Sequence, residues 1–291
     1  MQPSSTGPFP YTPITRRPKI KWPDNKRLAL WVIPNIETFP LDKLIPGGKS
    51  KRPPDVNNWA KREYGNRVGV FRLMKALSRF GVRGSVALNS SVCDAAPDVI
   101  EEALKLGWEL MGHGQTNTHQ LNHSDSIEEE REIIGQTVER IKQACGKAPR
   151  GWLGPGLQET WNTLDLLVEA GIKYTGDWTT DDQPYVITAE SGKLISIPYG
   201  HDMGDMNAIM RGHYSPAEIA QMIIDTFNVL YRESWESGRV MPISLHPFLT
   251  GTPHRIDALN KGLEYISRYE DVWFATGGEI YDYYTTSCEQ F

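Results

Sequence analysis

Short apolar runs alternate with amphipathic stretches along most of this sequence. The run at 27–33 is closed by Pro34 and predicts a buried strand, whereas the stretch at 68–80, whose apolar residues recur three and four positions apart, predicts a helix. Further strands are predicted at 83–88, 108–111, 151–153, 172–175, 193–198, 240–245 and 272–275. Further helices are predicted at 97–106, 127–145, 159–170, 216–234, 254–269 and 279–284.

Repeated units of a strand followed by a helix, joined by short connections, favour a parallel sheet covered by helices. A series of about seven such units in one chain favours a barrel over an open sheet. We therefore expect an α/β protein with a distorted (β/α) barrel of about seven parallel strands.

The first part of the chain lacks this alternation. Prolines recur throughout residues 1–26 and would interrupt any regular element, so this segment is predicted to be an irregular arm, followed by a single catalytic barrel domain at 27–291. Because the arm cannot build a core of its own, we expect it to pack along its own barrel or a neighbouring one, which favours a homo-oligomer. The polar stretch from about 41 to 66 is predicted to be a long, functional loop.

Composition and charge limit the classes of partner that the protein is expected to bind. The net charge of −5 is spread along the chain without a basic block, which argues against a nucleic-acid or membrane surface and favours a small-molecule substrate. The N-terminus has no apolar segment of the kind that a secretory signal needs, so a cytoplasmic location is expected. The three cysteines are widely spaced and indicate neither a disulfide framework nor a cysteine zinc site.

Polar residues directly follow several predicted strands, at the barrel end where active sites are built. Glu37 follows the first strand, His113 follows the strand at 108–111, and His246 follows the strand at 240–245. A buried polar side chain at such a position is costly unless it has a function. We predict that Glu37 orients or activates a water molecule, that His246 is the general acid, and that His113 polarises the carbonyl or shares the role of base.

Five more residues near these strand ends are predicted to contact a substrate. They are Asn35, Asn117, Trp152, Asp177 and Trp178. For the last three a simpler alternative is open, because a tryptophan after a strand is often part of the core and an aspartate there can cap a loop.

The order of these motifs resembles the polysaccharide-deacetylase family. The resemblance includes the polar end of the first strand, the His-Gly after Gly112, an Arg-Gly-Trp at 150–152, the Asp-Trp at 177–178 and the Leu-His at 245–246, and it extends over about 20–284. It is strongest to the allantoinase and cyclic-imide hydrolase branch, which shares the Asn-x-Glu at 35–37. That branch also shares the Ile-Pro-Tyr at 197–199, the Asp-Met at 205–206 and the Gly-x-Pro at 251–253.

The sequence departs from the metal-dependent members of that family. Those members place two aspartates after the first strand and a His-x-x-x-His pair after the later one, and an Asp and two His hold zinc or a similar ion. Here Asn35, Glu37 and Asn117 stand at three of those positions, and an amide is a poor zinc ligand. The resemblance to the allantoinase branch implies catalysis without a metal. A zinc ion completed by His119 is the alternative.

The resemblance and the strand-end residues together predict a hydrolase of a non-peptide carbon–nitrogen bond. Ring opening of a small cyclic amide or imide is the expected reaction, because imidazole and carboxylate chemistry without a metal suits a ring with a good leaving group. Two alternatives are a metal-dependent deacetylase of N-acetyl sugars and an inactive family member that only binds a ligand. The joint presence of Glu37, His113 and His246 argues against an inactive protein.

Overall fold

The computed structural model describes residues 4–48, 50–122, 126–200 and 203–287 of the chain. Within these ranges nine strands form one sheet in the order β6-β7-β5-β4-β3-β2-β1-β8, with β9 paired to β1. All neighbouring pairs are parallel except β6 and β7, which are antiparallel. The strands are β1 (Leu28–Ile36), β2 (Ser85–Leu88), β3 (Glu109–Gly112), β4 (Gly151–Trp152), β5 (Tyr174–Thr175), β6 (Tyr185–Thr188), β7 (Lys193–Ser196), β8 (Arg239–Leu245) and β9 (Val272–Phe274).

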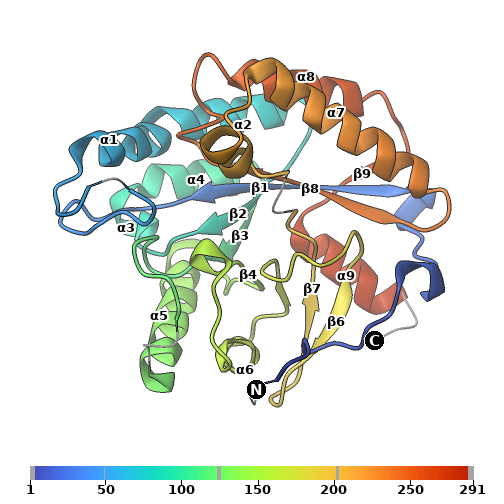
Figure 1. Cartoon of the computed structure of the whole chain (residues 1–291), viewed down its shortest axis with the longest axis horizontal. Helices are drawn as coiled ribbons and strands as arrows, with labels where there is room; N and C mark the ends of the chain where they lie inside the picture. Colours follow the sequence, from blue (N-terminus) through green and yellow to red (C-terminus); the bar gives the residue numbers. More distant parts are fainter. Residues whose placement is uncertain (1–3, 49, 123–125, 201–202, 288–291) are drawn as a thin grey trace.

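Helices α2, α7 and α8 lie together along β1 and β8 on the outer face of this curled sheet (Figure 1), whereas α9 packs Ile280 and Tyr284 into the interior of the barrel. Nine α-helices belong to the described part of the chain. They are α1 (Val56–Tyr64), α2 (Val70–Arg79), α3 (Val92–Ala95), α4 (Pro97–Lys105), α5 (Ile127–Cys145), α6 (Thr163–Glu169), α7 (Pro216–Glu233), α8 (Ile256–Ile266) and α9 (Gly277–Ser287). None of the helices described is both long and apolar enough to cross a membrane. The architecture confirms the predicted distorted (β/α) barrel.

Strand β1 pairs with three other strands, which breaks the regular order of the sheet. One edge of β1 pairs with β8 from Leu28 to Pro34. The other edge is shared, because β9 takes Leu28–Leu30 and β2 takes Asn35 and Ile36. The outer strands β6 and β8 are not paired with each other in the described sheet, but the Val240 N–H donates to the Asp182 carbonyl, 2.9 Å away, across the gap.

Alternation of side chains along the strands separates two cores. In β1, Trp31 and Ile33 join the apolar cluster inside the barrel, whereas Leu30 and Val32 join the cluster under the helices. A strand sends successive side chains to opposite faces, so the same alternation continues to residues that follow each strand. It directs the Glu37 side chain to the barrel interior at the carboxyl end of β1.

The long helices begin and end where the sequence signals them. Helix α5 starts with a capping box between Ser126 and Glu129, and α7 starts with another between Ser215 and Glu218. Helix α5 ends at Gly146, which is left-handed with φ 76°. These caps satisfy backbone groups that the first and last helical turns leave free.

The N-terminal arm packs along its own barrel. Ile20 and Trp22 are buried in the interior cluster, and the Trp22 indole N–H donates to the Arg239 carbonyl at 3.0 Å. Further along the arm, Phe9 packs edge-on against Trp178 and Tyr185. This is one of the two packings expected for the arm. A homo-oligomer, a cytoplasmic location and the division into an arm and one domain stay predictions.

One predicted loop and one segment without a predicted element contain regular structure. Helix α1 lies inside the stretch predicted as a polar loop from about 41 to 66, and it begins at Asp55, whose side chain accepts the Asn58 N–H. The antiparallel strand β6 lies in a segment for which no strand was predicted. Helix α1 buries no residue, so it has no apolar stripe to reveal it in the sequence.

Candidate active site

The three predicted catalytic residues meet at the carboxyl end of the barrel. Glu37 Oε1 lies 3.4 Å from His113 Nε2 and 3.7 Å from His246 Nε2. The same oxygen accepts the amide N–H of Asn117 at 2.8 Å. All three catalytic candidates are at most 7% exposed, and Glu37 Oε2 is buried without a hydrogen-bond partner. The structure therefore brings three of the residues predicted from sequence around the carboxylate of a fourth, Glu37.

Backbone contacts between loops hold Glu37 and Asn117 together. The Asn117 N–H donates to the Thr38 carbonyl at 3.0 Å, so the loop after β3 is tied to the loop after β1. Asn89 joins the same two loops, because its Oδ1 accepts the Thr38 N–H at 2.9 Å and its amide donates to the His113 carbonyl. Neighbouring strand ends are thus fixed relative to one another before any ligand binds.

The ring of His113 is held in one tautomer. Its Nδ1 lies 2.5 Å from the Leu153 carbonyl, which can only accept, so Nδ1 carries the hydrogen. The lone pair of the neutral ring is then on Nε2, which has no hydrogen-bond partner and faces Glu37. The glycine after His113 makes the turn, because Gly114 has φ +66° and a Cβ there would meet Pro155 at 2.9 Å. A neutral His113 is suited to accepting a proton at Nε2.

His246 is held by a carboxylate that the sequence analysis did not select. Asp205 Oδ1 is 2.7 Å from His246 Nδ1, and Asp205 Oδ2 accepts the His246 backbone N–H, also at 2.7 Å. The Thr250 hydroxyl donates to Oδ2 at 2.6 Å. This arrangement orients the ring so that Nε2 points toward Glu37, as a carboxylate orients the histidine of a catalytic triad.

Opposite charges set the protonation of this cluster. Burial by itself raises the pKa of Glu37, but its interaction with the nearby His113 and the charges of His246 and Arg62 outweigh it, so the pKa lies below the usual glutamate value. Burial by itself lowers the pKa of His246, but Asp205 and then Glu37 outweigh it and raise that pKa above the usual histidine value. The site thus favours an ionised Glu37 beside a protonated His246.

Asn35 lines the site but is engaged with the protein. Its amide nitrogen lies 3.2 to 3.3 Å from three acceptors, the Ile33 carbonyl, the Ser244 hydroxyl and the Leu245 carbonyl. The Tyr199 hydroxyl donates to its oxygen at 3.2 Å. These bonds join the end of β1 to β8, so the structure gives Asn35 a role in holding the site, and its contact with a substrate stays a prediction.

Asp177 and Trp178 lie at the end of β5, beside a second carboxyl group. Asp177 accepts the Gly154 N–H at 2.7 Å, and the Trp178 indole donates to Glu159 at 3.1 Å. Burial raises the pKa of Asp177 to about 6, although the Gly154 N–H opposes the rise. Burial and the charge of Asp177 raise the pKa of Glu159 well above its usual value. Both predicted residues are half-buried, and their contact with a substrate stays a prediction.

Trp152 is packed away from the catalytic cluster. Its fully buried side chain belongs to the apolar cluster with Ile134 of α5 and Leu164 of α6, on the helix side of the sheet. Because β4 alternates, Trp152 points outward and its neighbour Leu153 points into the barrel. The structure therefore corrects the predicted substrate contact of Trp152 to the core role that was its alternative.

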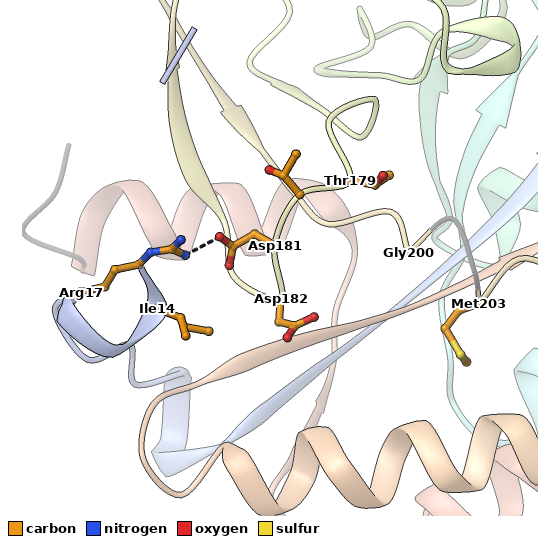
Figure 2. A pocket seen from close by; sticks show the side chains of 8 residues that line it. Ile14, Arg17, Thr179, Asp181, Asp182, Gly200 and Met203 are labelled. Carbon is orange, nitrogen blue, oxygen red and sulfur yellow. Dashed lines mark ion pairs between the residues drawn. The ribbon is translucent and has the colours of Figure 1, made fainter. Parts of the chain in front are cut away.

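Two cavities lie beside the barrel. The larger, of about 590 Å³, lies between the N-terminal arm and the segment after β5, and Arg17 pairs with Asp181 at 2.5 Å beside it (Figure 2). None of the predicted site residues lines it. The smaller adjoins Glu37 and leaves no room for the centre of a water molecule. It is lined by Asn35, Glu37, Phe39, Arg62, Gly65, Asn66, Pro247 and Phe248.

The donor atoms differ from the metal ligands that the family resemblance implies. At the third ligand position Asn117 turns its amide N–H toward Glu37, and a hydrogen-bond donor repels a cation. Within the described part of the chain, no three His, Cys, Asp or Glu side chains form a group that could hold a metal ion. His119, the predicted substitute, is exposed. His246 Nε2 is a further nitrogen near the carboxylate, at 3.7 Å. Catalysis without a metal stays a prediction.

Comparisons with known proteins agree with the fold. A sequence model of the polysaccharide deacetylase family matches residues 63–175. The peptidoglycan deacetylase of Helicobacter pylori is 25% identical over 268 residues, which cover 81% of this chain and 89% of that protein.

Two crystal structures share nearly the whole fold. The structure of Puue allantoinase superposes with a TM-score of 0.85 at 26% identity and covers 94% of this chain and 95% of its own. A probable polysaccharide deacetylase from Pseudomonas aeruginosa superposes with a TM-score of 0.83, also at 26% identity, and covers 94% of this chain and 96% of its own. The sequence match lies in the half of the barrel that carries His113, and the structural matches extend it over the remainder. Residues 63–175 therefore match the polysaccharide deacetylase family, and the overall fold is similar to that of these two crystal structures.

Proposed function

We propose that this chain hydrolyses an amide bond within a small ring, as in a cyclic amide or imide, and that it does so without a bound metal. Hydrolysis of a carbon–nitrogen amide bond is the activity common to the superfamily, and it is the coarser part of the proposal. One observation supports the more specific part of the proposal, which is a cyclic substrate opened without a metal. Glu37 Oε1 is surrounded by two imidazole Nε2 atoms and the amide of Asn117, where metal-dependent relatives would have a second histidine.

The geometry supports a general acid–base reaction. Glu37 Oε2 has no partner and can accept a hydrogen bond from a water molecule, and the Nε2 lone pair of His113 can share the departing proton. The second hydrogen of the Asn117 amide makes no bond to a described residue and can donate to the carbonyl oxygen as its charge develops. Each of these groups lies around the same carboxylate, which is a requirement for concerted proton transfer.

Bond cleavage then needs a proton for the ring nitrogen. Water adds to the carbonyl carbon, its proton passes to Glu37, and the carbon–nitrogen bond breaks as His246 gives its Nε2 proton to the departing nitrogen. Asp205 keeps His246 protonated and oriented for this step. The ring opens to a single product that carries a new carboxylate and a new N–H group. Because no metal ion stabilises the oxyanion in this scheme, a strained or imide-like ring is a better substrate than a plain acetamide.

A metal-dependent deacetylase of N-acetyl sugars is the second candidate. The name of the Helicobacter pylori relative favours it, and so does the nearness of Glu37 to the Nε2 atoms of both His113 and His246. An inactive binding protein is a third class, and the ionisable cluster with its oriented His246 argues against it.

A substrate panel tests the proposal. Hydantoins, cyclic imides and N-acetylated oligosaccharides are incubated with the purified protein, and ring opening and acetate release are followed separately. Ring opening that is lost in Glu37→Gln supports the proposal. Release of acetate without ring opening would overturn the proposal in favour of the deacetylase. If neither ring opening nor acetate release occurs, only the binding protein remains.

A further inference from the structure

Arg62 lies beside the catalytic cluster, at a position that was predicted to be loop. It is in the last turn of α1, and its guanidinium carbon lies 4.5 Å from the centre of the Phe39 ring and 4.8 Å from the centre of the Phe248 ring. Phe39 follows Glu37 along the chain and Phe248 follows His246. The guanidinium is therefore held between the two loops that carry the proposed base and acid.

An unusual helical turn brings Arg62 to this place. The chain continues from α1 into a π-helical turn at Gly65–Gly69, which packs directly on the loop after β8. A Cβ at Gly69 would lie 2.1 Å from the Pro247 carbonyl oxygen, and one at Gly65 would lie 2.8 Å from the Phe248 nitrogen. Only glycine allows so close an approach of two backbones. Single π-helical turns are frequent at functional sites, and this one sets α1 against the catalytic cluster.

The hydrogen bonds of Arg62 leave one side of its guanidinium unused. Nη1 donates to the side chain of Asn58 and, at 3.4 Å, to its carbonyl. Nε is buried without a partner, and Nη2 donates to no described residue. The N–H bonds of Nε and Nη2 point the same way, as a fork whose spacing matches the two oxygens of a carboxylate.

The charge of Arg62 is also not neutralised at close range. No described carboxylate lies within ion-pair distance of it, although its charge acts on Glu37, Asp55 and His246. A buried N–H donor without an acceptor is unfavourable, so an acceptor that arrives with a ligand would be bound strongly. The narrow cavity shared by Arg62, Glu37 and Phe248 is where such an acceptor would enter.

We propose that Arg62 is a specificity-determining residue, which binds a carboxylate group of the ligand through its Nε–H and Nη2–H. Its place in the reaction rests on the proposed function, since ring opening creates a carboxylate close to Glu37. The carboxylate has two sources: the product of ring opening, or a substituent that the substrate already carries. The cavity is too narrow to hold a carboxylate as it stands, so binding requires the guanidinium or the Phe248 ring to move.

Binding of a carboxylate tests the proposal without any turnover. Succinamate, the open form of succinimide, is titrated into the protein by calorimetry, and the uncharged succinamide is titrated beside it. We expect wild type to bind succinamate at least about 10-fold more tightly, as for a charge-assisted bidentate contact. Arg62→Gln should remove this preference, and Arg62→Lys should restore part of it because the charge remains and the fork is lost. Arg67→Gln, an exposed arginine in the adjoining π-helical turn, is the matched control.

Two results would overturn the proposal. One is equal binding of succinamate and succinamide by wild type, which needs no variant to fold. The other is a weakening of succinamate binding that is the same in Arg62→Gln and Arg67→Gln. If the protein binds succinamate through Arg62 but opens no ring, the proposed function fails and the carboxylate site stands.

Kinetics with the same variants distinguish the two sources of the carboxylate. If it belongs to the product, Arg62→Gln raises the product inhibition constant by about 10-fold or more and leaves the KM of a neutral ring unchanged. If it belongs to the substrate, wild type prefers rings that carry a carboxylate, and Arg62→Gln loses that preference through KM. A variant that changes neither constant for an active enzyme contradicts the proposal.

Discussion

Asp205 holds His246 by two contacts at once, one to Nδ1 and one to the backbone N–H, each at 2.7 Å. This pair fixes both the direction of the ring and its proton. We expect Asp205→Asn to lower kcat by about 10²-fold or more, because an amide neither favours the imidazolium nor selects the same tautomer.

A pH profile distinguishes this role from simple loss of structure. The basic limb of kcat should move to lower pH in Asp205→Asn, because the carboxylate that raises the His246 pKa against the effect of burial is gone. Asp225→Asn, at an exposed position of α7, should leave both kcat and the limb unchanged. If Asp205→Asn has a normal kcat and the basic limb of its pH profile does not shift, Asp205 has no part in the mechanism.

Substitution of either Glu37 or the proposed acid His246 should reduce turnover severely. Glu37→Gln removes the oxygen pair around which His113, His246 and Asn117 gather, and His246→Ala removes the proton donor. Each should lower turnover of the true substrate by about 10²-fold or more. If both variants kept turnover within about threefold of wild type, well inside what a lost acid or base costs, the assignment of roles would be wrong.

The pH dependence of wild type follows from the two pKa shifts. Activity needs an ionised Glu37, whose pKa is lowered, so it should fall only below the usual glutamate pKa of about 4.3. It also needs a protonated His246, whose pKa is raised, so it should fall only above the usual histidine pKa of about 6.5. Measurement of kcat/KM between these limits should give a plateau. A rate that rises throughout this interval would place the base on an imidazole instead.

A pair of glycine substitutions tests the contact that places Arg62. Gly69→Ala puts a Cβ 2.1 Å from the Pro247 carbonyl oxygen, so the backbone must shift, and we expect a loss of about 1–3 kcal/mol in the free energy of unfolding. Gly135→Ala in α5, where a Cβ meets nothing within 4 Å, should gain about 0.5–1 kcal/mol. Urea unfolding measures both. Equal effects would mean that the helix and the loop after β8 are not packed as described.

The sequence was informative wherever a periodic apolar pattern or a strand end was present. The bounds of α5 match the predicted 127–145, because a capping box and a left-handed glycine mark its two ends. Glu37, His113 and His246 could be predicted to converge, since parallel strands bring their carboxyl ends to one edge. Trp152 was misplaced because a two-residue strand gives too little alternation to tell inward from outward.

The site residues that could not be predicted from the sequence lie in segments without a periodic apolar pattern. Helix α1 buries no residue, so neither it nor Arg62 has a signal in the apolar spacing. Asp205 lies in a segment without periodicity, and its partner His246 is 41 residues away, so only the fold reveals the pair. The Asp-Met at 205–206 was noted only as part of the resemblance.

Catalysis without a metal is tested most directly by the rate of ring opening in protein whose metal content is known. The substrate is the hydantoin or cyclic imide that is opened fastest, and zinc, cobalt and nickel are determined by elemental analysis before and after chelation. We expect full turnover with far less than one equivalent of metal per chain, unchanged by the chelator. One equivalent of metal per chain, with activity lost on its removal and regained on its return, would show that the enzyme needs a metal.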